Sequence, residues 1–234
     1  GAVFFREGEL AKAAASFERA ARLNVKNSDR SELYKLAATY VLLGEREKAS
    51  SALEEAHRRN PRNPEGENHL AWAYCRLGRL AESLDAAERG IRAGNGGFAY
   101  PYFWKGLTLH FLERDEDAIA TWRAGQPQLP VTPDLFLFPA LILGDSGRPE
   151  EAISDLLHSL PRLGGDARIH ALLGRCLQEC RGHLDPSRTR EVRVALEAAL
   201  TKEPASGWLK RSLALAEILD APPAAGSMDR ALAL

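Results

Sequence analysis

The sequence repeats itself with a period of about 34 residues, and this periodicity restricts the possible folds more than any other feature. Glycines at Gly8, Gly44, Gly78 and Gly147 each separate two helix-like patterns, and Glu113 stands where another glycine is expected. Charged, helix-forming stretches such as GEREKASSALEEA follow these positions. A unit of two short helices cannot bury its apolar face alone, so we expect the units to stack on one another.

Small residues recur in register in both helices of the unit. The first helix has Ala37, Ala71, Gly106, Ala140 and Gly174, and the second has Ala13, Ala49, Ser83, Ala118 and Ala152. Large apolar residues such as Tyr40, Tyr74, Phe17, Leu53 and Trp122 lie between them. Small residues let two helix backbones approach closely, and large ones fill the groove beside them. The pattern therefore predicts an all-α fold of packed helical hairpins.

At these positions the sequence resembles the tetratricopeptide-repeat (TPR) family. Residues 30–63 match the family pattern almost throughout, and the resemblance covers essentially the whole chain, weakening after Gly164. The resemblance implies an all-α, right-handed superhelical solenoid of antiparallel helical hairpins, with about six to seven repeats. We expect one solenoid over 1–234, with repeats at about 1–29 (partial), 30–63, 64–98, 99–132, 133–166, 167–204 (with an insertion) and 205–234 (partial or capping).

Lys105 and Pro139 depart from the pattern, because each occupies an apolar interior position of a first helix. Proline removes a backbone donor and clashes with the preceding turn, so we expect Pro139 to kink or shorten its helix. Both ends of the chain read as cut within a repeat, so we expect the chain to be a fragment of a longer protein. A signal peptide in the full-length protein would then not be visible here.

Composition restricts the partners. The formal net charge of -1 gives no electrostatic reason to bind nucleic acid or an anionic membrane surface. No apolar run approaches the roughly 20 residues needed to span a bilayer, so we expect no membrane insertion. Cys75, Cys176 and Cys180 are too few and too odd in number for a disulfide framework, which favours a reducing, cytoplasmic compartment.

The family resemblance implies that ligand peptides or helices lie in a concave groove lined by the first helix of each repeat. The expected partner-binding residues are Tyr34, Asn68, His69, Trp72, Tyr100, Phe103, Trp104, Leu107, Phe111, Leu137 and Phe138. Exposed aromatic side chains are typical interface anchors. Alternatively, these rings pack inside the solenoid. That alternative is favoured for Tyr102 and Trp122 at interior positions, and both alternatives stay open for Trp72, Phe103 and Trp104.

The sequence therefore favours a protein-interaction scaffold or adaptor that binds a peptide or helix of another protein. An alternative is a substrate-recruiting or regulatory arm of a larger enzyme, such as a glycosyltransferase. Self-association through terminal repeats is also possible, because such repeats expose apolar faces. An RNA-binding helical repeat is disfavoured by the neutral charge. Chaperone-tail binding is disfavoured because the positions that would hold basic residues hold Tyr34, Ala38, Asn68 or His69, Tyr100 and Trp104.

Patterns that suggest chemistry all have a simpler explanation. Cys176, Cys180 and His183 have a spacing that suits zinc but lack a fourth ligand, so we expect structural cysteines. The acids at 115–117 begin a helix, where they complement its dipole. No nucleophile motif of a known kind is recognised. We expect no catalytic site, no cofactor and no bound metal.

Overall fold

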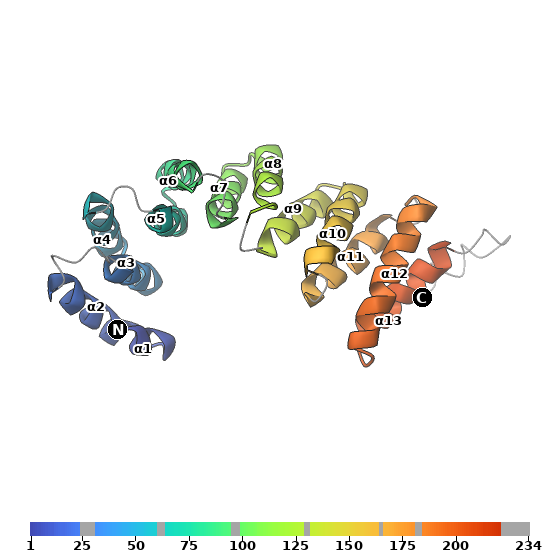
Figure 1. Cartoon of the computed structure of the whole chain (residues 1–234), viewed down its shortest axis with the longest axis horizontal. Helices are drawn as coiled ribbons and strands as arrows, with labels where there is room; N and C mark the ends of the chain where they lie inside the picture. Colours follow the sequence, from blue (N-terminus) through green and yellow to red (C-terminus); the bar gives the residue numbers. More distant parts are fainter. Residues whose placement is uncertain are drawn as a thin grey trace. The chain divides into compact units, whose positions relative to one another are not determined.

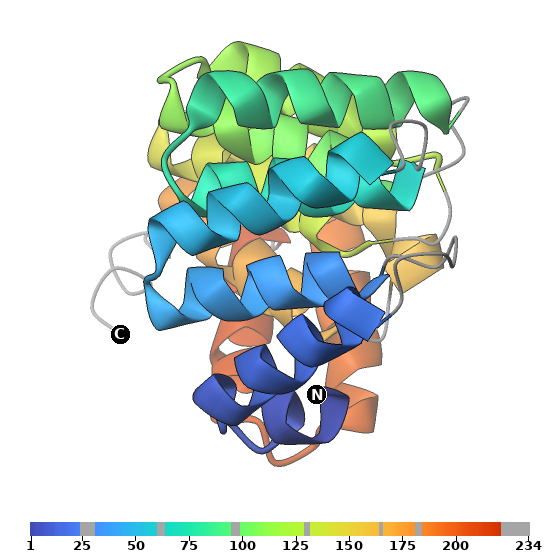
Figure 2. The same cartoon turned by 90° about the vertical axis from the view of Figure 1, so that its left-hand side faces the viewer.

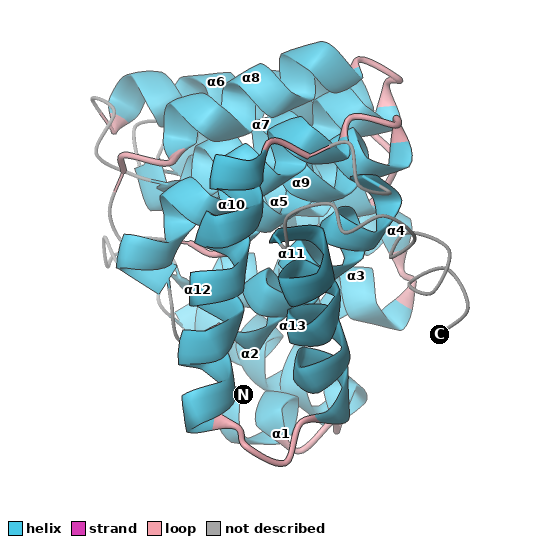
Figure 3. Cartoon of the chain, turned by 90° about the vertical axis from the view of Figure 1, so that its right-hand side faces the viewer, coloured by secondary structure: helices cyan, strands magenta, loops and turns pink. Residues whose placement is uncertain are grey.

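The structure is a computed structural model that describes residues 1–23, 31–59, 64–94, 99–128, 132–163, 166–180 and 184–220. Within these ranges every regular element is an α-helix, drawn in cyan in Figure 3 with the connecting loops in pink. The prediction of an all-α, helical-hairpin fold is confirmed. The helices form two compact units, Gly1–Pro130 and Val131–Leu234, and each is described by itself. The prediction of one solenoid over 1–234 stays a prediction.

The first unit contains four hairpins in chain order (Figures 1 and 2). Its helices are α1 (Ala2–Arg6), α2 (Leu10–Leu23), α3 (Ser31–Leu43), α4 (Arg46–Arg59), α5 (Pro64–Arg76), α6 (Leu80–Ala93), α7 (Ala99–Phe111) and α8 (Asp115–Gly125). The first helix of each later hairpin packs on its own partner and on the neighbouring first helix, so that α5 lies between α3 and α7.

The second unit continues the alternation. Its helices are α9 (Asp134–Asp145), α10 (Pro149–Leu163), α11 (Ala167–Cys180), α12 (Pro186–Lys202) and α13 (Gly207–Asp220). Helix α11 packs against α9, α10, α12 and α13, which makes it the central helix of this unit.

The turns within the hairpins explain the glycine spacing. Gly8, Gly44, Gly78 and Gly147 have left-handed φ angles of 77°, 76°, 75° and 74°. After Gly44, the amide of Glu45 donates to the carbonyl of Tyr40 at 2.9 Å, which closes the end of α3. Glu113 adopts the same conformation with φ 59°, although a side chain disfavours it. The period therefore predicted the turn at Glu113 even without a glycine.

Small residues at the registered positions lie in the core, as the pattern predicted. Ala37, Ala71 and Ala140 are fully buried. Gly106 lies directly against the ring of Trp122, which is itself fully buried and whose Nε1 donates to the carbonyl of Phe103 at 3.1 Å. Trp122 is therefore an interior residue, as expected. Tyr102 is only half-buried.

The two departures from the repeat pattern are accommodated locally. Pro139 is buried inside α9, and the helix continues through it to Asp145; at 12 residues α9 is one residue shorter than α3, α5 and α7, and a kink at Pro139 stays a prediction. Buried neighbours such as Leu135 and Leu143 hold the helix in place on both sides of the proline. Lys105 is half-buried, and its ammonium lies 3.1 Å from the carboxylate of Glu88 in α6, so its charge is paired.

Candidate functional site

The strongest candidate surface lies on the first helices α3, α5 and α7 of the first unit. Each of these helices buries one side against its hairpin partner and leaves the opposite side accessible. Because α5 lies between α3 and α7, the accessible sides of the three helices are neighbours. Residues at matching repeat positions therefore form rows that run across the helices.

Large apolar side chains dominate this surface on α5 and α7, and together we call them the aromatic wall: Trp72, Tyr100, Trp104, Leu107 and Phe111. Tyr100 is 40% exposed and Phe111 is 54% exposed, whereas the other three are half-buried. Trp72 and Trp104 also pack against the buried core of the unit. The wall thus combines accessible apolar surface with rings that the core holds in place.

Three residues predicted to bind a partner are buried instead: Tyr34, Phe103 and Leu137, at 4%, 9% and 6% exposure. The ring of Tyr34 stacks on His69 in the next hairpin, with centroids 5.3 Å apart. Phe103 meets Trp104 edge-on at 4.7 Å. The open surface expected at these three residues is therefore small, and that they contact a partner stays a prediction. Tyr34 and Phe103 pack against the half-buried rings of His69 and Trp104.

Polar groups on α5 accompany the wall. Asn68 and His69 are half-buried. The Asn68 Oδ1 atom is shielded from solvent and has no hydrogen-bond partner within the described part of the chain. An amide without a partner retains its capacity to bond to a ligand when its side chain rotates. That Asn68 hydrogen-bonds a ligand stays a prediction.

Two exposed residues of the same surface were not among the predicted contacts. Leu42 in α3 is 47% exposed, and Arg76 in α5 is exposed as well. Both occupy the repeat position that Phe111 occupies in α7. The repeat register is the sequence signal that places both residues on the inward-facing side of their helices.

The first helices of the second unit carry paired charged residues where α7 carries apolar ones. Arg168 in α11 lies 3.2 Å from Asp134 in α9, and Arg175 pairs with both Asp145 and Glu179. These charged residues occupy positions that hold Tyr100, Leu107 and Phe111 in α7. Phe138 in α9 is half-buried. That Phe138 acts together with the aromatic wall stays a prediction.

The cysteines do not form a site. Cys75, Cys176 and Cys180 are all buried and free. Burial, with nearby carboxylates, raises the pKa of Cys176 to about 12 and that of Cys180 to about 11. Such thiols stay protonated near neutral pH and are poor nucleophiles. The described residues include no group of three metal-ligating side chains, and His183 lies outside them.

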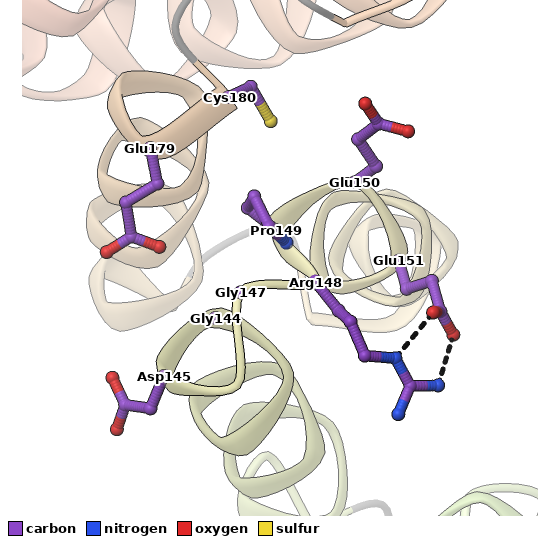
Figure 4. Close-up of a pocket in the computed structure, with 9 residues that line it drawn as sticks. All are labelled: Gly144, Asp145, Gly147, Arg148, Pro149, Glu150, Glu151, Glu179 and Cys180. Carbon is purple, nitrogen blue, oxygen red and sulfur yellow. Dashed lines mark hydrogen bonds and ion pairs between the residues drawn. The ribbon is translucent and has the colours of Figure 1, made fainter.

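A cavity of about 610 Å³ in the second unit is another candidate (Figure 4). Carboxylates of Asp145, Glu150, Glu151 and Glu179 surround it, and the Cys180 thiol points toward it. Most of this charge is already paired, because Glu151 binds Arg148 at 2.6 Å and both Asp145 and Glu179 bind Arg175. The cavity therefore has less unpaired negative charge available to a ligand than its acidic lining suggests. That the chain has no catalytic site stays a prediction.

Among the described helices, none has the length and apolar character needed to cross a membrane.

Comparison with known proteins supports the fold. No protein-family model matches the chain. Over 87 residues the chain is 33% identical to the photosystem I assembly protein Ycf3 of Synechococcus sp. (strain CC9605), covering 36% of this chain and 50% of that protein. The match thus spans about half the length of this curated relative.

Solved structures show the same architecture. A thermophilic TPR protein of Thermus thermophilus is 24% identical, with a TM-score of 0.59 over 76% of this chain and 95% of that chain. The type IV pilus biogenesis factor PilW is 19% identical, with a TM-score of 0.63 over 90% and 93%. PilF of Pseudomonas aeruginosa is 14% identical, with a TM-score of 0.63 over 92% and 93%. At these identities the likeness concerns the fold.

Proposed function

We propose that the chain, whose fold is that of tetratricopeptide-repeat proteins, is an interaction scaffold that binds a segment of another protein. The binding site is the aromatic wall of the first unit, with Asn68 and His69 beside it. The printed names of similar proteins agree with this class of role, since one is an assembly protein and another a biogenesis factor.

The observation that carries the proposal is the partial exposure of large apolar residues on adjacent helices. Trp and Tyr dominate the energetics of many interfaces, because each buries a large area with few rotatable bonds. Core packing behind Trp72 and Trp104, and the contact between Phe103 and Trp104, restrict the rings before a ligand arrives. Less side-chain entropy is then lost on binding.

A peptide or a single helix is the ligand that suits this geometry. The wall on α5 and α7 and the exposed Leu42 on α3 span three neighbouring helices, and each contributes only a few accessible side chains. Asn68 and His69 lie on the middle helix α5, and we propose that they bond to the ligand backbone. Phe138 of the second unit is proposed as a further contact for a longer segment.

Capture from a cell lysate tests the proposal. The whole chain is immobilised, and retained proteins are compared with those retained by a Trp72→Ser, Trp104→Ser, Phe111→Ser variant. Val194→Ser is the matched control, because Val194 is 54% exposed but lies on α12, a second helix that carries no residue of the aromatic wall. Circular dichroism establishes that each variant is folded.

We expect proteins that the native chain and the Val194 variant retain to be lost from the triple variant. Equal retention by all three chains would refute binding at the aromatic wall. Loss from both variants would show that retention depends on general apolar exposure rather than on this surface.

A further inference from the structure

Arg76 is an exposed cation beside the aromatic wall. It ends α5, one helical turn after Trp72, so the two side chains lie on the same side of the helix. Its guanidinium forms no ion pair within the described part of the chain. Of the carboxylates near the neighbouring turns, Glu45 pairs with Lys48, and Asp115 binds His110 at 2.6 Å.

The repeat register places Arg76 between two exposed apolar side chains. Leu42 in α3 and Phe111 in α7 occupy the same repeat position as Arg76, and they are 47% and 54% exposed. Because α5 lies between α3 and α7, the three residues form a row in the order apolar, basic, apolar. We call it the Arg76 row.

In the second unit, the charged residues at the equivalent repeat positions form ion pairs within the chain. Asp145 and Glu179 occupy this position in α9 and α11, and Arg175 of α11 binds both. In that unit, the carboxylates of α9 and α11 are therefore paired with an arginine of α11. Arg76 forms no such pair within the described residues, and its planar guanidinium is well matched to a carboxylate of a ligand.

We propose that the partner is an extended segment with an acidic residue between two large apolar residues, the acid binding Arg76. The apolar residues contact Leu42 and Phe111. This inference rests on the proposed function, since it specifies the ligand of the same surface.

The spacing of the motif follows from the distance between helices. Packed helices lie about 8–10 Å apart, and a polyproline II chain advances ~3.1 Å per residue with three residues per turn. One turn therefore spans roughly 9 Å, so every third side chain of such a segment meets a successive helix. The predicted motif is apolar-x-x-acidic-x-x-apolar. In a helical ligand the same distance would require a spacing of about six residues.

Synthetic peptides test the inference on the whole chain. The probe is a fluorescein-labelled peptide that contains the sequence LSPESPL, in which the prolines favour the extended form. Comparison peptides replace the central Glu by Gln or Lys, or move the leucines to a spacing of one or six. Fluorescence polarisation measures binding to the native chain, to Arg76→Glu, to Arg76→Gln and to the control Arg46→Glu. Arg46 is also exposed, but it lies on the second helix α4.

We expect the Glu peptide with three-residue spacing to bind best, about tenfold tighter than its Gln counterpart. Arg76→Gln should remove that preference, Arg76→Glu should reverse it toward the Lys peptide, and Arg46→Glu should leave it unchanged. Equal binding of the Glu, Gln and Lys peptides would overturn this inference and leave the proposed function standing. Best binding at six-residue spacing would overturn the extended form. Absence of binding by every peptide would overturn the motif, whereas the proposed function depends on the separate capture experiment.

Discussion

The contact between Gly106 in α7 and Trp122 in α8 makes this hairpin sensitive to a single methyl group. A Cβ atom at position 106 would lie 2.6 Å from Cδ1 of Trp122 and closer still to Nε1 and Cε2. Ordinary contact begins at about 3.4 Å, so the two groups would have to separate by roughly 1 Å. The ring is fully buried and bonded to the carbonyl of Phe103, so it has little room to move.

These contacts set the expected cost of Gly106→Ala. Overpacking a core costs about 1–3 kcal/mol. Displacing the ring also weakens the Trp122 hydrogen bond, worth about 1 kcal/mol. The higher helix propensity of alanine relative to glycine offsets this loss by about 1 kcal/mol. We therefore expect a net loss of about 2 kcal/mol in the free energy of unfolding.

Urea denaturation followed by tryptophan fluorescence measures this loss. Trp72, Trp104 and Trp122 all lie in the first unit, so the signal reports mainly on its unfolding. Gly144→Ala is the matched control, followed by circular dichroism because Gly144 lies in the second unit. A Cβ there meets only the end of the flexible Glu179 side chain, at 3.3 Å, and the more distant Cys176 sulfur, so stability should stay equal or rise by up to about 1 kcal/mol.

A second substitution tests the cause. At the same repeat positions, other hairpins combine an alanine with a leucine, as in Ala37 with Leu53 and Ala140 with Leu156. In a Trp122→Leu background, Gly106→Ala should therefore cost nothing or become stabilising. If Gly106→Ala is equally costly in both backgrounds, the loss does not arise from the tryptophan contact and the reasoning is refuted.

Three further predictions concern stability and reactivity. Glu113→Gly should stabilise the chain by about 1 kcal/mol in the same urea assay, because glycine adopts φ 59° without the cost of a side chain; an unchanged midpoint would contradict this. Glu67→Ala should lower the free energy of unfolding by about 2–3 kcal/mol in thermal or urea unfolding, because Glu67 is 3% exposed and binds Arg89 at 2.9 Å. A loss below about 0.5 kcal/mol would show that the ion pair adds little stability. Cys176 and Cys180 should react with a thiol reagent at about pH 8 much more slowly in the native than in the denatured chain. The reason is that their raised pKa values keep both thiols protonated below about pH 11. Equal rates in the two chains would show that the thiols are accessible and ionised.

The turns and the core were predictable because both depend on local geometry. A left-handed turn residue recurs wherever two helices of fixed length meet, so the glycines and Glu113 appear at regular intervals. Close helix packing requires small side chains, and Ala37 and Ala71 are indeed fully buried. Such requirements act within one hairpin, where the sequence contains all the interacting parts.

The accessible surface was harder to predict, because it depends on the next hairpin. Tyr34 and Phe103 occupy positions at the boundary between the buried and accessible sides of their helices. Tyr34 is covered because His69 of the following repeat stacks on it. Lys105 is similar, since it fits an interior position only because Glu88 of the preceding hairpin pairs with it. Side-chain contacts between repeats have no periodic signal in the sequence.

Stability and binding therefore rest on different residues of the same helices. Helix α7 shows the separation: Gly106 and Phe103 hold it against Trp122, while Tyr100 and Phe111 remain accessible. Helices α9 and α11 keep the same fold with ion pairs on their first-helix surface. Since the repeat tolerates both chemistries at these positions, changes to the exposed residues Tyr100 and Phe111 should alter ligand choice with little loss of stability. A variant of the wall that loses its partner while retaining its unfolding midpoint would show the two sets of residues to be independent.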